Sequence, residues 1–204
     1  GPLTYSGRAA HLIPSGATTF SKATWNYPAN APRILTHGEG SHVFSEDGCE
    51  YIDYVLGLGP IVLGYGDKEV DEAVRRASVD GPLFALATPH EVMLAEELVD
   101  LLPFAEMVKF GKGGTDVTSA AVRLARHITG RDVIASAGYH GWSDAFSPNL
   151  NGIPKSIRAL TQEWTYNDLD SLERIFAEHA GRVACVILEP VGFEFPNPGF
   201  LQAV

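Results

Sequence analysis

Residues 111–116, with the sequence GKGGTD, place glycines and a threonine hydroxyl between an expected strand and an expected helix. The first amides of a helix lack intrahelical partners, and the helix dipole favours an anion there. Glycine lets the backbone approach a phosphate closely, and Thr115 adds a hydroxyl donor. The segment has neither the Walker order GxxxxGK[ST] nor the dinucleotide pattern GxGxxG. On its own it fits an anion site and a plain turn with Asp116 as N-cap about equally well.

Residues 138–142, GYHGW, follow another expected strand, at the end where ligands bind in open α/β sheets. Tyr139 and His140 have rings that can stack on a flat ligand or donate hydrogen bonds to it. The alternative, slightly favoured for this segment alone, is an aromatic loop packed on the core.

Glu189 directly follows a third expected strand, the continuous apolar run at residues 183–188. Its alternative role is a surface carboxylate before a turn. Because the carboxyl ends of parallel strands meet at one edge of a sheet, the three candidates support one another. Together they predict a pocket for a flat aromatic ligand that carries a phosphate.

Other kinds of site find little support in the sequence. The seven histidines form no HxxxH pair and no Cys/His pair, so no metal site is expected. The nucleophile-elbow motif GxSxG of α/β-hydrolases is absent. Cys49 and Cys185 do not make a disulfide framework, and they favour a reducing, cytoplasmic setting.

The composition fits a packed, soluble globular protein. The chain has 204 residues, 45% of them hydrophobic and 20% charged, as in a packed globular protein. Its formal net charge of -10 disfavours general binding to nucleic acid or to anionic membranes. No stretch approaches the roughly 18 continuous apolar residues of a membrane-spanning helix. The first residues lack the apolar core of a secretory signal, so none is expected.

The apolar periodicity predicts an α/β fold with a mostly parallel sheet, because strands alternate with helices in its second half. Residues 1–37 are expected to be an irregular, extended arm that is packed on a surface and is not a free linker, and a glycine-rich stretch covers residues 56–66. The expected elements are a hairpin at 42–54, helices at 67–78, 90–101, 117–129 and 168–180, and strands at 107–110, 133–136 and 183–188.

The sequence resembles the class III, fold-type-I aminotransferases that use pyridoxal 5′-phosphate (PLP), especially the glutamate-1-semialdehyde 2,1-aminomutase branch. The order and spacing of the matching blocks make this resemblance specific. The blocks are IPSG (13–16), DGCEYIDYVLGLGP (47–60), ATPHEVMLAEEL (87–98), KFGKGGTD with VRLARHITGRD (109–132), YHGWSD (139–144), VILEPV (186–191) and PNPGFL (196–201).

The resemblance implies roles for the candidate residues. Gly113, Gly114 and Thr115 match the family's Ser-Gly-Thr phosphate loop. Tyr139 and His140 match its Tyr-His-Gly motif, whose aromatic ring lies against the cofactor ring. The remaining cofactor-site residue is Glu189, which matches the Glu-Pro pair near the polar edge of the cofactor.

The chain departs from the family pattern in the loop expected to bind the phosphate and at two residues expected to contact the substrate. Gly113 replaces the usual serine, which removes one hydroxyl bond to phosphate and predicts weaker binding. The aminomutase has a Ser-Pro-Val-Arg segment and a tryptophan before Gly-Pro, where this chain has Lys22 and Leu58. Lys22 keeps the charge of arginine but not its bidentate fork. These substrate-site differences favour a transaminase acting on another substrate over the aminomutase.

The resemblance also implies residues that this chain does not contain. The family's Schiff-base lysine and its aspartate at the pyridine nitrogen follow the Glu-Pro pair, so they are expected beyond Val204. None of the five lysines matches the Schiff-base motif. The chain is therefore expected to hold the N-terminal half of the fold: arm, hairpin and helix of the small domain in 1–80, and the first part of the PLP-binding large domain in 81–204.

The expected activity is amino transfer between an amino acid or amine and a carbonyl compound. The family forms homodimers, so a second copy is the expected partner. With neither key group the chain alone is expected to be inactive, and the exposed flank of residues 183–188 is expected to be an adhesive edge. The alternatives left open are the aminomutase, an inactive PLP-fold scaffold and a phosphate-binding module without covalent chemistry.

Overall fold

The computed structural model describes residues 4–204, and the chain divides into two units, Gly1–Pro89 and His90–Val204. Residues 1–3 lie outside the described residues. Two predictions fall partly on them, namely the irregular arm at residues 1–37 and the lack of a secretory signal at the start of the chain. The expected domain boundary after residue 80 stays a prediction.

The first unit begins with helix α1 (Tyr5–Leu12), so the prediction of an irregular arm was wrong there. Thr4 accepts a hydrogen bond from the Gly7 amide, and the Glu46 carboxylate accepts one from the Tyr5 amide at 2.8 Å. These acceptors satisfy amides that a helix start leaves open. Three short 3₁₀ turns follow, namely η1 (Pro14–Gly16), η2 (Phe20–Lys22) and η3 (Thr24–Asn26).

The aromatic residues of the arm were expected to be packed, and within the first unit they are not. Phe20 and Trp25 are both exposed, and their rings meet each other edge to face at 6.0 Å. A pair of aromatic rings is too small to exclude water from either of them, so this segment has no core of its own.

The sheet of the first unit confirms the predicted hairpin. Strands β2 (His42–Ser45) and β3 (Glu50–Ile52) are antiparallel and are joined through Asp47 and Gly48. Gly48 has a φ of 82°, the conformation that makes Asp-Gly a strong hairpin signal. Strand β1 (Leu35–Glu39) was not predicted, and it pairs with the other side of β2 to give the order β1-β2-β3.

The glycine-rich stretch is held to this sheet by Asp53. Its carboxylate accepts hydrogen bonds from the Tyr65 hydroxyl at 2.7 Å and from the Val55 amide at 2.8 Å. The hydrogen bond from Tyr65 holds the pKa of Asp53 below its usual range, and the same bond raises the pKa of Tyr65. Leu58 lies in this loop with a φ of 72°, a left-handed conformation that is uncommon for leucine.

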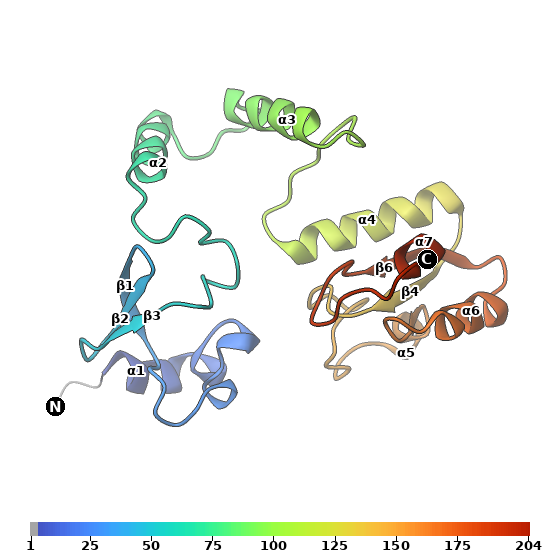
Figure 1. The fold of residues 1–204 in the computed structure, drawn as a ribbon, viewed down its shortest axis with the longest axis horizontal. Coiled ribbons are helices and arrows are strands. Elements are labelled where there is room, and N and C mark those ends of the chain that lie inside the picture. Colours follow the sequence, from blue (N-terminus) through green and yellow to red (C-terminus); the bar gives the residue numbers. More distant parts are fainter. Residues whose placement is uncertain (1–3) are drawn as a thin grey trace. The chain divides into compact units, whose positions relative to one another are not determined.

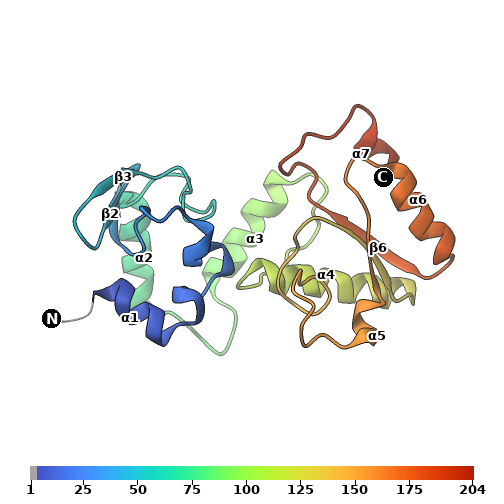
Figure 2. The same ribbon diagram turned by 90° about the horizontal axis from the view of Figure 1, so that it is seen from below.

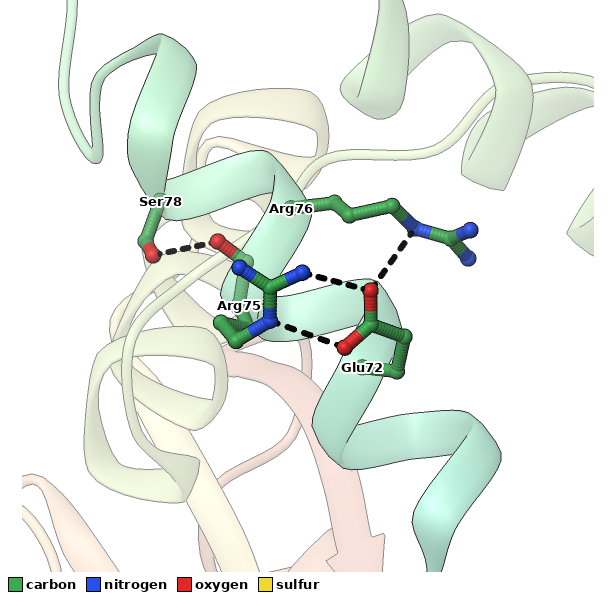
Figure 3. A network of polar contacts seen from close by, with 4 residues as sticks. All are labelled: Glu72, Arg75, Arg76 and Ser78. Carbon is green, nitrogen blue, oxygen red and sulfur yellow. Dashed lines mark hydrogen bonds and ion pairs between the residues drawn. The ribbon is translucent and has the colours of Figure 1, made fainter.

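Helix α2 (Lys68–Asp80) confirms the predicted helix and its cap, because Asp67 accepts hydrogen bonds from the Glu69 and Val70 amides. Its outer face holds the polar network drawn in Figure 3. Arg75 binds both carboxylate oxygens of Glu72, at 2.7 and 2.8 Å, and lowers the pKa of that carboxyl group. These groups are exposed, so water and salt screen them and the network contributes little to stability.

The second unit is an α/β layer structure around one parallel sheet (Figure 1). The strands are β4 (Val133–Ala137), β5 (Thr161–Glu163) and β6 (Val183–Leu188), in the order β5-β4-β6. The predicted strands at 133–136 and 183–188 are confirmed, and β5 was not predicted. The helices are α3 (Pro89–Leu101), α4 (Gly114–Thr129), α5 (Lys155–Arg158), α6 (Leu169–Glu178) and α7 (Phe200–Ala203).

The core of this unit lies around β4, all of whose residues are buried. Val133, Ala135 and Ala137 pack with residues of α6, α7 and β6 in one cluster. Successive strand residues point to opposite faces, so Ile134 lies on the other face of the sheet. In Figure 1, α4 and α6 lie on opposite sides of this sheet, and Figure 2 shows the same elements turned by 90°.

Several apolar residues that were predicted to be buried are exposed instead. Phe176 of α6 is exposed, although its neighbours Leu172 and Ile175 are buried as expected. The predicted stripes of α3 and α4 are partly open, since Val92 and Ile128 are exposed. Within the second unit these exposed residues meet no complementary apolar surface, so periodicity alone could not bury them.

The strand predicted at 107–110 is wrong, because this segment has no ladder partner within the described residues. Met107 and Phe110 are both exposed. A segment becomes a strand only where it can pair with the edge of another strand. Both edges of the central strand β4 are already paired, with β5 and with β6. β6 is itself an edge strand, which leaves it half-buried rather than buried on both faces, apart from Val183.

No helix formed by residues 4–204 is long and apolar enough to cross a membrane.

Candidate functional site

Helix α4 begins at Gly114, three residues before the predicted start, with Gly113 as its N-cap. The Asp116 carboxylate accepts a hydrogen bond from the Gly113 amide at 3.0 Å. Asp116 is therefore the third residue of the helix, so the alternative in which it is the N-cap is wrong. This is the reverse half of a capping box, and it orders the backbone of the glycine loop.

The first turn of α4 presents open backbone donors. Among residues 4–204, neither the Gly114 amide nor the Thr115 amide has a hydrogen-bond partner. Gly113 and Gly114 are exposed, so an anion can reach these donors. Free amides and the positive end of the helix dipole together favour a phosphate at this position.

The loop after β4 lies directly on this turn. A Cβ atom added to Gly141 would stand 2.4 Å from Thr115 Oγ1 and 3.1 Å from Thr115 Cα. The Trp142 amide also donates a hydrogen bond of 3.4 Å to Thr115 Oγ1. Two segments that are separated in the sequence thus meet at van der Waals distance, and only glycine allows so close an approach.

His140 is buried inside this loop. Its Nε2 atom lies 2.9 Å from the Ala137 carbonyl oxygen, and its ring meets Phe146 edge to face. The ring therefore supports the loop from within. The expected part of His140 in cofactor binding stays a prediction, and the burial indicates that it would act by shaping the loop.

Tyr139 lies two residues after Ala137, the last residue of β4, and Glu189 directly follows Leu188, the last residue of β6. Ala137 of β4 pairs with Leu188 of β6, so the two side chains emerge at the same sheet edge. Tyr139 is 62% exposed, which leaves its ring available to a ligand, and Glu189 is also exposed. The loop of Glu189 is anchored by the Tyr166 hydroxyl, which donates a 2.6 Å hydrogen bond to the Pro190 carbonyl oxygen.

A hollow of about 400 Å³ opens beside this loop, on its β5 side. It combines an apolar wall with polar and charged groups. Its lining includes Ser136, Gly138, Asp144, Phe146, Thr161 and Trp164.

The remaining predicted residues come from other segments of the chain. Lys22 and Leu58 belong to the first unit, where both are exposed. Lys112 is exposed in the loop before α4. Residues 4–204 contain no cluster of three or more histidine, cysteine, aspartate or glutamate side chains that could hold a metal ion.

The site as a whole suits a phosphorylated aromatic ligand. The donors at the start of α4 fit a phosphate, the exposed Tyr139 ring offers a stacking surface, and Glu189 adds a carboxylate at the same sheet edge. The residues present thus fit the group that the sequence predicts, within the second unit alone.

Two residues that build this site received no role in the sequence analysis. Gly141 was noted only as part of a motif, and its contact with Thr115 has no signature in spacing. Thr118 fits the helical pattern, so nothing in the sequence indicates that its hydroxyl reaches the aromatic loop. For Asp116 a signal existed, since an acidic residue three positions after an N-cap is typical of a capping box.

Comparison with known proteins places these features in context. A family model described as aminotransferase class-III matches residues 25–204. Glutamate-1-semialdehyde 2,1-aminomutase of Anaeromyxobacter sp. (strain Fw109-5) is 36% identical over 215 residues, covering 97% of this chain and 50% of the relative. The 3-aminobutyryl-CoA aminotransferase of Cloacimonas acidaminovorans (strain Evry) is 36% identical over 203 residues, covering 96% and 49%.

Among solved structures, the PLP internal aldimine form of the FumI protein from Sphingopyxis sp. MTA144 matches with a TM-score of 0.91 and 32% identity. The match covers 98% of this chain and 50% of that chain. It confirms the expected fold-type-I α/β architecture. The chain spans about half the length of the curated relatives it matches.

Proposed function

Because the chain belongs to the class-III aminotransferase family, we propose that its protein is a PLP-dependent aminotransferase. It would move an amino group between an amino acid or amine donor and a carbonyl acceptor. The observation that carries this proposal is the seating of Gly141 on Thr115, beside the open amides of α4. This contact joins a phosphate cradle to an aromatic platform, which is what a phosphorylated pyridine requires.

The residues of this chain would bind and orient the cofactor. The amides of Gly114 and Thr115 would donate to its phosphate, and the Thr115 hydroxyl would add a further donor. Tyr139 would stack on the ring and exclude water from one of its faces. Glu189 would orient donors at its polar edge. When bound, PLP supplies the electron sink that makes amino transfer possible.

We propose that the proton-transferring groups of the reaction lie outside residues 1–204. No lysine of this chain stands in a Schiff-base motif, and Lys112, which directly precedes Gly113, belongs to the exposed glycine loop. The chain by itself would then bind parts of the cofactor without completing a catalytic cycle. The expected homodimer and the expected cytoplasmic location are part of the same proposal, and the free thiols of Cys49 and Cys185 agree with a reducing setting.

The second candidate is the aminomutase reaction, which is favoured by the names of several relatives at 36% identity. Lys22 and Leu58 argue against it, because they stand where the aminomutase branch has an arginine and a tryptophan. Both residues are proposed to shape the substrate site.

The two reactions are separated by an assay of the full-length protein loaded with PLP. We expect amino transfer from an amino donor to an added keto acid, and no turnover of glutamate-1-semialdehyde when no acceptor is present. Turnover of glutamate-1-semialdehyde alone would establish the aminomutase instead. A full-length protein that takes up no PLP would contradict both proposals.

Substitution of Gly113 by serine is expected to strengthen PLP binding about tenfold, because a hydroxyl bond to a charged phosphate is among the stronger hydrogen bonds. Gly113 has extended dihedral angles, and a Cβ atom there would meet nothing closer than Asp116 Oδ2 at 3.8 Å. The measurement is a spectroscopic titration with PLP. Gly113→Ala is the control, since it adds the Cβ without the hydroxyl and should bring no gain. Equal affinity of the serine and alanine variants would refute the role of the missing hydroxyl.

A further inference from the structure

Three contacts run along the line where the loop at residues 138–143 meets the first turns of α4. The Trp142 amide reaches Thr115 Oγ1 at 3.4 Å, and the hydroxyl groups of Ser119 and Ser143 lie 3.4 Å apart. Between them, Thr118 Oγ1 donates to the His140 carbonyl oxygen at 2.8 Å. The outer two contacts are long, so the bond from Thr118 is the strong one of the three.

The Thr118 hydroxyl has acceptors within its own helix as well. The carbonyl oxygens of Gly114 and Thr115 lie 3.1 and 3.2 Å away, the usual back-bonding positions of a helical threonine. A hydroxyl has one proton to donate, and the acceptor on the other segment is the nearest. The bond therefore joins two segments rather than closing a local turn.

The acceptor of this bond depends on Thr118. Among residues 4–204, the His140 carbonyl oxygen accepts no other hydrogen bond. His140 is a buried residue, and its ring is fixed by the Ala137 carbonyl oxygen. Loss of the Thr118 hydroxyl would leave a polar atom unpaired at a partly buried position, which favours opening of the loop.

We propose that Thr118 is a positioning residue that holds the loop at 138–143 on the first turn of α4. The inference rests on the proposed function, because the segments it joins carry the proposed phosphate donors and the proposed stacking ring of Tyr139. With the two segments fixed together, a ligand with both a phosphate and a ring meets both parts of its site at once. A ligand without a phosphate gains little from this arrangement.

The experiment compares Thr118→Val with Thr118→Ser in the full-length protein. Valine has the same shape without the hydroxyl, and serine restores the hydroxyl. We expect amide hydrogen exchange at residues 140–143 of the cofactor-free Thr118→Val protein to be about 5- to 30-fold faster. PLP affinity should fall by a similar factor, whereas affinity for pyridoxal, which lacks the phosphate, should change by less than about twofold. Thr118→Ser should behave as wild type.

Ser119→Ala is the matched control, since its 3.4 Å contact on the same line is weak and its loss should change little. Unchanged exchange at residues 140–143 in Thr118→Val would overturn the inference, and so would equal losses of PLP and pyridoxal affinity. A wild-type protein that binds no PLP would refute the proposed function separately. The exchange rates of the cofactor-free variants would then still decide whether Thr118 holds the loop.

Discussion

Replacement of Gly141 by alanine is expected to lower PLP affinity by about 100-fold. The new Cβ atom would stand 2.4 Å from Thr115 Oγ1, 3.0 Å from Thr115 Cβ and 3.1 Å from Thr115 Cα. A rotamer change of Thr115 would relieve the contact with Oγ1 but not those with Cβ and Cα, whose positions the backbone fixes. The loop must instead move away from α4, which separates the phosphate donors from the Tyr139 ring.

The size of this effect follows from two costs. Overpacking of a tight contact typically costs about 1–3 kcal/mol. Gly141 also has a φ of 120°, in a region that residues with a Cβ atom rarely adopt, at a further cost of about 1–2 kcal/mol. Because about 1.4 kcal/mol corresponds to tenfold in affinity, a combined cost near 3 kcal/mol gives the expected factor.

The matched control is Gly138→Ala in the same loop. Gly138 also has a positive φ, of 93°, but a Cβ atom there would meet nothing within 4 Å. The Gly138→Ala variant has the same cost of a positive φ but no steric overlap, so its affinity for PLP should fall by no more than about tenfold. Titration of both variants with PLP measures the difference. If Gly141→Ala bound PLP as well as Gly138→Ala, the contact with Thr115 would have no part in the site.

Substitution of Ile134 by alanine is expected to have the largest effect on stability in the second unit. Ile134 lies in the central strand β4, and none of its surface is exposed. Truncation of a fully buried isoleucine removes its transfer free energy and leaves a cavity, at a cost of about 2–5 kcal/mol. Domains are stable by only about 5–15 kcal/mol, so much of the stability margin would be lost.

Ile128→Ala is the control for this prediction, because it makes the same chemical change at an exposed position of α4. The side chain of an exposed isoleucine contributes little to stability, and alanine is the better helix former. The free energy of unfolding should therefore change by less than about 0.5 kcal/mol. Urea unfolding followed by tryptophan fluorescence measures both variants. If the two substitutions destabilised the protein equally, the assignment of β4 as the centre of the core would be wrong.

The elements that the sequence predicts correctly have local signals. Asp67 and the apolar spacing after it mark α2, and the continuous apolar run at 183–188 marks β6. Such features depend on residues only a few positions apart. The same holds for the candidate site, since the glycine loop and the aromatic loop are recognisable as motifs that follow strands.

The features that were missed depend on residues far apart in the chain. Helix α1 has no strong pattern of its own, and it is capped in part by Glu46, 41 residues away from Tyr5. Strand β1 forms because β2 offers it an edge, whereas the strand-like residues at 107–110 find no edge among residues 4–204. The contacts of Thr115 with Gly141, and of Thr118 with His140, are likewise tertiary, and no spacing rule predicts them.

The central claim is that the start of α4 and the loop after β4 together bind PLP. A crystal structure of the full-length protein with PLP tests it most directly. We expect the phosphate oxygens within hydrogen-bond distance of the Gly114 and Thr115 amides, and the pyridine ring against Tyr139. A phosphate bound away from the start of α4, or a cofactor ring with no contact to Tyr139, would contradict this account.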